Sequence, residues 1–128
     1  MQEKHLFEYA VIRVVPRVER EEFLNVGIIL YCRGQRYLKT VYTLNEARLC
    51  AFAGGELDML ELKDRLHAFE RICTGGRDGG TIGQLPIAER FRWLTATRST
   101  IVQTSQVHPG LCTDAHQTLE HLYAQLVL

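Results

Sequence analysis

The chain of 128 residues has the length of one domain, and its apolar share of 46% and charged share of 23% are ordinary for a globular protein. Fifteen basic residues balance fifteen acidic ones, so the overall attraction to phosphate that marks many nucleic-acid binders is missing. No apolar run is long enough to span a bilayer, and the first residues lack the pattern of a secretory signal. We therefore expect a single cytoplasmic domain over residues 1–128, without nucleic-acid binding.

The first half of the chain predicts a β-meander. Residues 7–15 form a nearly continuous apolar, β-branched run that ends at Pro16, and residues 23–32 form a second such run. The turn residues Arg33-Gly34-Gln35 then lead into a third strand over 36–42. Three neighbouring strands with short connections favour antiparallel pairing.

Helices dominate the middle of the chain. Thr43 and Glu46 have capping-box spacing and predict a short helix that ends at Gly54-Gly55. A longer helix is expected from about 56 to 73, because its apolar residues recur at intervals of three and four and form one stripe. This stripe consists of Met59, Leu62, Leu66, Phe69 and Cys73.

The last third predicts a loop, two helices and a short strand. Residues 74–84 read as a glycine-rich loop, and Pro86 opens a helix that buries Ile87, Phe91 and Leu94. A strand is expected near 99–105, followed by a turn over 107–110. Asp114 with Gln117 caps a terminal helix, whose inner face carries Ala115, Leu119, Leu122 and Leu126. The predicted fold class is α+β, with a three- or four-stranded, mostly antiparallel sheet and helices packed mainly on one face.

Arg13 and Asn25 interrupt the two longest apolar strands. A symmetric hairpin with Val15 opposite Phe23 places Arg13 opposite Asn25 and Val11 opposite Gly27, with all four on one face. A guanidinium in such a strand needs an anionic or carbonyl partner, and Gly27 indicates a bulge or a close backbone approach. The alternative is that Arg13 reaches solvent at the sheet edge or pairs with Glu22.

Residues 95–110, TATRSTIVQTSQVHPG, are rich in polar side chains. Thr95 and Thr97 can satisfy the end of the preceding helix, which explains part of this polarity. The other polar residues either surround a phosphate, a carboxylate or a partner's backbone, or hydrogen-bond within the fold. These residues are Arg98, Ser99, Thr100, Gln103 and Ser105.

Metal binding and thiol catalysis are not expected. The four cysteines, Cys32, Cys50, Cys73 and Cys112, form no CxxC pair and are expected to be reduced packing residues. Three histidines lie near Cys112, but Pro109-Gly110 interrupts any helix that would bring all four side chains together. A Cys112 nucleophile would need a spatially adjacent base such as His108 or His116. We expect no cofactor.

Three groups of residues together carry a family resemblance. They are Tyr9-x-Val11-x-Arg13-x-x-Pro16, Glu22-x-x-Asn25-Val26-Gly27-x-x-Leu30, and Thr97-Arg98-Ser99-Thr100 with Gln103-x-Ser105-x-x-His108-Pro109-Gly110. With these motifs the chain resembles the bacterial family catalogued as domain of unknown function 3037. That resemblance implies no activity or catalytic residue. It does imply an accessory or regulatory role, similar to a toxin–antitoxin accessory, because members are often encoded beside kinases that resemble the HipA toxins.

The leading functional hypothesis is a non-catalytic subunit that binds a protein partner such as a HipA-like kinase. The alternative is a small enzyme or sensor that binds a phosphorylated or nucleotide-like ligand. The candidate ligand- or partner-binding residues are Arg13, Asn25, Arg98, Ser99, Thr100, Gln103 and His108.

Overall fold

The computed structural model describes residues 3–54, 57–98 and 100–128. Within them, five strands form one antiparallel sheet: β1 (His5–Val14), β2 (Leu24–Cys32), β3 (Tyr37–Tyr42), β4 (Val102–Thr104) and β5 (His108–Cys112). The helices are α1 (Glu46–Ala53), α2 (Met59–Thr74), α3 (Gly80–Gly83), α4 (Ile87–Leu94) and α5 (Ala115–Leu126). The α+β class is confirmed, and the sheet is one or two strands wider than predicted.

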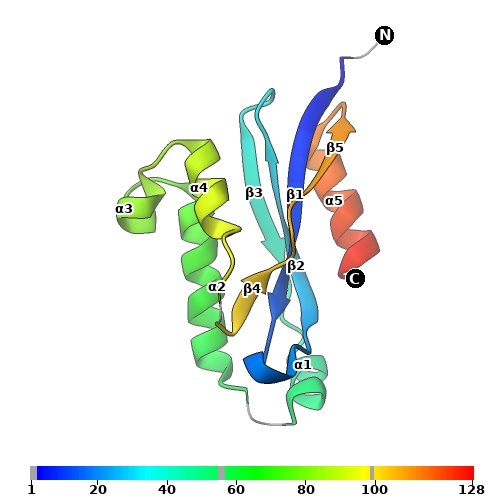
Figure 1. The fold of residues 1–128 in the computed structure, drawn as a ribbon, viewed down its shortest axis with the longest axis vertical. Helices are drawn as coiled ribbons and strands as arrows, with labels where there is room; N and C mark the ends of the chain where they lie inside the picture. Colours follow the sequence, from blue (N-terminus) through cyan, green and yellow to red (C-terminus); the bar gives the residue numbers. More distant parts are fainter. Residues whose placement is uncertain (1–2, 55–56, 99) are drawn as a thin grey trace.

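The sheet is covered on both faces (Figure 1). On the face that we call the α2 face, Ala10, Ile12 and Ile29 pack against α1, α2 and α4. On the opposite α5 face, Val11, Ile28 and Leu30 pack beneath α5. Burial on two faces explains why β1 and β2 read as nearly continuous apolar runs. Most helices lie on the α2 face as expected, and α5 is the exception.

Strand β1 is the centre of the sheet. It pairs with β2 on one side, and on the other side with β4 over Ile12–Val14 and with β5 over His5–Tyr9. β3 pairs with the outer side of β2. The predicted pairing of Arg13 with Asn25 is confirmed, but Gly27 pairs with Ile12 and not with Val11. The register shifts here because Val26 is an extra residue of β2, which forms a bulge.

Gly27 sits where the backbone of β3 approaches closely. A Cβ atom at this position would lie 2.5 Å from the Val41 carbonyl oxygen and 2.7 Å from Tyr42 Cβ. The sequence expectation of a bulge or a close backbone approach at Gly27 is therefore correct on both counts.

The predicted turn over 107–110 is wrong, because His108–Cys112 forms β5. Pro109 is compatible with this strand because β5 pairs with β1 on one side, so a missing N–H can face away from the ladder. Gly110 is required because the Phe7 ring lies against it, 2.5 Å from where a Cβ would be.

The predicted helices are present with shifted boundaries. The N-cap of α1 is Asn45, whose side chain accepts from Arg48 N, and not the predicted Thr43. Asp58 caps α2, and Asp114 caps α5 as predicted. The glycine-rich segment, predicted as a loop, contains a 3-10 turn (Arg77–Gly79) and the single-turn helix α3. No helix in the described ranges has the length and apolarity needed to cross a membrane.

Candidate functional site

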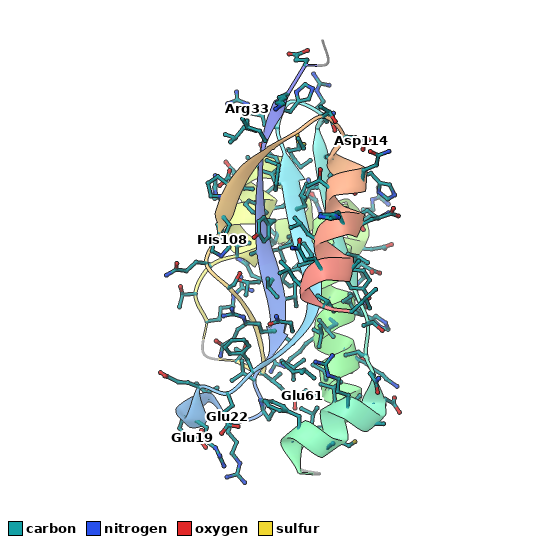
Figure 2. The ribbon with its side chains drawn as sticks, turned by 90° about the vertical axis from the view of Figure 1, so that its right-hand side faces the viewer. Glu19, Glu22, Arg33, Glu61, His108 and Asp114 are labelled. Atoms are coloured by element: carbon teal, nitrogen blue, oxygen red, sulfur yellow. The ribbon has the colours of Figure 1, made fainter. Side chains whose placement is uncertain are left out.

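The predicted site residues divide between the two faces of the sheet. Arg98, Thr100 and Gln103 line a groove of about 240 Å³ between α2, the end of α4 and β4, which we call the Arg98 groove. Arg13 and Asn25 lie on the α5 face, because Arg13 alternates with Val11 along β1 and Asn25 pairs with Arg13. His108 lies outside both groups, on β5 at the sheet edge (Figure 2). Ser99 lies outside the described residues.

The wall of the Arg98 groove is mainly apolar. Phe69 and Ile72 of α2 face Trp93 and Leu94 of α4, and Val102 of β4 closes the side between them. Trp93 remains 39% exposed, although Phe69 is buried. The full lining consists of Arg65, Ala68, Phe69, Ile72, Trp93, Leu94, Ala96, Arg98, Thr100, Val102, Gln103 and Thr104.

Arg98 is fixed at this groove by Trp93. Its Nη2 donates to the Trp93 carbonyl oxygen at the end of α4, and its guanidinium carbon lies 4.0 Å from the centroid of the Trp93 ring. Burial lowers the pKa of the Arg98 guanidinium. The side chain therefore satisfies a helix-end carbonyl and also covers an aromatic face with a cation.

Neighbouring polar side chains also bond within the chain. Thr95 Oγ1 donates to the Phe91 carbonyl at 2.8 Å, Thr100 Oγ1 to the Val102 carbonyl at 2.7 Å, and Gln103 Nε2 to the Thr100 carbonyl at 2.9 Å. Structural hydrogen bonding, the alternative considered from the sequence, thus accounts for these donors. Their bonding leaves the groove with an apolar wall and two arginines, Arg65 and Arg98.

Arg13 has a different environment. Its guanidinium carbon lies 3.9 Å from the centroid of the Phe23 ring, and burial lowers the pKa of the guanidinium. Glu22, the partner considered from the sequence, instead binds Arg20 with an N–O distance of 2.6 Å. Asn25 Nδ2 donates to the Leu126 carbonyl at the end of α5, at 3.3 Å. Arg13 does not line the Arg98 groove, so the two arginines do not converge on one ligand.

His108 and His116 each contact other side chains of the fold. The His108 ring contacts the ring of Tyr9, with centroids 5.3 Å apart. Burial raises the pKa of the Cys112 thiol, which disfavours the nucleophilic thiolate. His116 pairs with the Tyr37 hydroxyl and with Glu120, each at 3.1 Å. Over the described part of the chain, no three His, Cys, Asp or Glu side chains are placed to hold a metal ion.

The contribution of α2 and Trp93 to the groove was not predicted from the sequence. Phe69 was assigned to the core, and Arg65 and Ile72 were not considered, because nothing local indicates that β4 returns beside α2. Trp93 had one readable signal, since it lies off the inward stripe of Ile87, Phe91 and Leu94.

Comparison with known proteins identifies one family. The family model described as "Protein of unknown function (DUF3037)" matches residues 9–127. No curated protein and no solved structure matches the chain. The match covers nearly the whole chain and includes every candidate residue on both faces of the sheet. The chain therefore belongs to the DUF3037 family of proteins of unknown function.

Proposed function

We propose that this chain is a non-catalytic subunit that binds a protein partner through the Arg98 groove. The observation that carries the proposal is the pairing of Arg98 with a partly exposed Trp93 at the edge of an apolar groove. Tryptophan and arginine are the residues most enriched at the energetic centres of protein interfaces, where they combine apolar area with directional donors. A fixed Trp–Arg pair also loses little side-chain entropy when a partner binds.

The chemistry of the groove wall suits a partner side chain better than a small polar ligand. The hydroxyl and amide donors of Thr100, Gln103 and Thr104 are bonded to backbone carbonyls. Phe69, Ile72 and other apolar side chains thus supply most of the available contact surface. Burial of that surface by an apolar side chain would provide the driving force for association.

A HipA-like kinase is the partner to test first, because the family resemblance associates such kinases with this kind of chain. The purified chain is titrated with a purified HipA-like kinase encoded by the same genome, and the dissociation constant is measured by calorimetry. Ala68→Trp fills the groove from α2 and is expected to weaken binding about tenfold or more, a loss of about 1.4 kcal/mol.

Ala124→Trp is the matched control, because it makes the same substitution at an exposed position of α5 outside the groove. It is expected to leave the dissociation constant unchanged, and both variants should unfold at the temperature of the unmodified chain. Equal binding by the two variants would exclude the groove as the docking surface. Absence of any complex with the kinase would exclude that partner.

A further inference from the structure

Arg13 carries a charge that no acidic side chain of the described chain neutralises. Glu22, the partner considered from the sequence, is held by Arg20. The Nε atom of Arg13 is sealed from solvent and has no hydrogen-bond partner. Its one identified contact is the Phe23 ring, 3.9 Å from the guanidinium carbon. A partly desolvated cation without a counter-charge is unfavourable, so this arrangement calls for an explanation.

Two amide side chains flank Arg13 on adjacent strands. Asn25 on β2 and Gln103 on β4 are both cross-strand partners of Arg13, so the three residues form one row across the sheet. Asn25 Oδ1 is a second buried polar atom without a partner, although Nδ2 of the same side chain is bonded to the Leu126 carbonyl. Two unsatisfied polar atoms therefore lie in one row, one a donor and the other an acceptor.

The accessible part of Arg13 is the end of its guanidinium group, which carries the two terminal nitrogens. The two terminal nitrogens are not among the buried unpaired atoms, and no hydrogen bond occupies them within the described residues. Phe23 supports the flat face of the guanidinium and is itself 43% exposed. α5 ends at Leu126, part way along the sheet (Figure 1), and the Leu126 carbonyl is bonded to Asn25, so the helix ends at this row. The fork is therefore held in place and accessible.

We propose that Arg13, at the centre of the row of Asn25, Arg13 and Gln103, is a binding site for a carboxylate group. The two terminal nitrogens of Arg13 donate in parallel to the two carboxylate oxygens, the geometry that a guanidinium and a carboxylate share. Arg13 is the one cation of the row, which matches the single charge of a carboxylate. A phosphate monoester would bring a second charge without a second cation in the row. Arg13 itself does not line the Arg98 groove, whereas Gln103, its neighbour in the row, does.

The test is a titration followed by ¹H–¹⁵N NMR, including the Arg13 Nε–H signal. The probes are N-acetylglycine, a capped Ala-Glu-Ala peptide and inorganic phosphate, at constant ionic strength. We expect both carboxylates to shift signals of the β1, β2 and β4 residues around Arg13 saturably. Arg13→Gln should abolish the shifts, and Arg13→Lys should weaken binding about tenfold, because lysine lacks the parallel donors. Unchanged chemical shifts far from the row would show that the variants remain folded.

Arg33→Gln is the control, because Arg33 is an exposed arginine after the far end of β2, at the opposite end of the sheet from Glu22 (Figure 2). Its affinity for both carboxylates should equal that of the unmodified chain. Tighter binding of the peptide than of N-acetylglycine would support the site and identify its carboxylate as part of a partner chain, whereas equal binding would support a free carboxylate. The proposal is overturned by the absence of saturable shifts, by equal affinity for phosphate, or by an equal loss in Arg33→Gln.

Discussion

Ser105 offers the sharpest test of how polar residues of the segment 95–110 serve the fold. Between the pairs Ile12–Thr104 and Tyr9–His108, the segment opposite β1 has one residue more than β1 itself. The ladder of backbone hydrogen bonds is therefore interrupted. Ser105 bridges the gap: its Oγ accepts from Val11 N at 2.8 Å and donates to the Gln106 carbonyl at 2.9 Å. Its backbone N donates to the Val11 carbonyl at 2.8 Å. The hydroxyl thus replaces a missing strand acceptor.

Ser105→Ala should lower the free energy of unfolding by about 1 to 3 kcal/mol, the cost of leaving a buried N–H without a partner. Ser105 is 6% exposed and Val11 is 7% exposed, so water has little access to compensate. For a domain of this length the loss corresponds to a decrease in Tm of roughly 4 to 12 °C. Urea unfolding measures the free energy, and hydrogen exchange at the Val11 amide reports the broken bond directly.

Thr104→Val provides the comparison, because the Thr104 hydroxyl makes only a 3.4 Å hydrogen bond to the Thr95 carbonyl and is partly exposed. Its loss should cost less than about 0.5 kcal/mol, as for most partly exposed substitutions. If Ser105→Ala were as mild as Thr104→Val and Val11 stayed protected from exchange, the hydroxyl would not be completing the ladder.

Three further substitutions test other parts of the structure. Arg98→Ala should lower the unfolding free energy by about 1 kcal/mol in urea titrations, through loss of the bond to the Trp93 carbonyl and of the ring contact, and an unchanged stability would contradict the role assigned to Arg98. Gly27→Ala should cost about 1 to 3 kcal/mol in the same assay, because its Cβ meets the Val41 carbonyl at 2.5 Å; a neutral effect would mean that β3 is not held this closely. Burial raises the pKa of the Cys73 thiol from 9.0 to about 11, so the fold favours the protonated thiol, and the resulting stability, present below pH 9, is lost as the pH rises to 11. Cys73→Ala should flatten this alkaline decrease in stability, and an identical pH profile would show that another group is responsible.

The first half of the fold could be predicted because its signals are local. The apolar runs of β1 and β2, the turn at Arg33-Gly34-Gln35 and the stripe of α2 each lie within a few turns or one strand of sequence. The Arg13–Asn25 pair followed from counting back from the hairpin loop. The same counting failed one residue later at Val26, because a bulge depends on packing against β3 and not on the loop.

β5 could not be predicted from local sequence, because Pro-Gly is normally a turn signal. Both residues fit in β5 because of contacts with residues that lie about one hundred positions earlier in the sequence. Pro109 pairs with Glu8 at the sheet edge, and Gly110 makes room for the Phe7 ring. The width of the sheet was underestimated for the same reason, since β5 is defined by pairing with β1 and not by its own composition. β4 lies within the range 99–105 where a strand was expected.

Residue type and sequence position alone did not show which of the two arginines, Arg13 or Arg98, has donors available for a ligand. From the sequence both arginines were candidates, with Glu22 as the alternative partner of Arg13 and hydrogen bonding within the fold as the alternative for Arg98. In the structure Arg98 bonds the Trp93 carbonyl and stacks on its ring, whereas Glu22 is bound to Arg20. A guanidinium whose donors are used within the fold contributes mainly contact area to an interface, and one whose fork is open can select a ligand by charge and shape. Partner binding is therefore best sought in the Arg98 groove, and carboxylate recognition at Arg13.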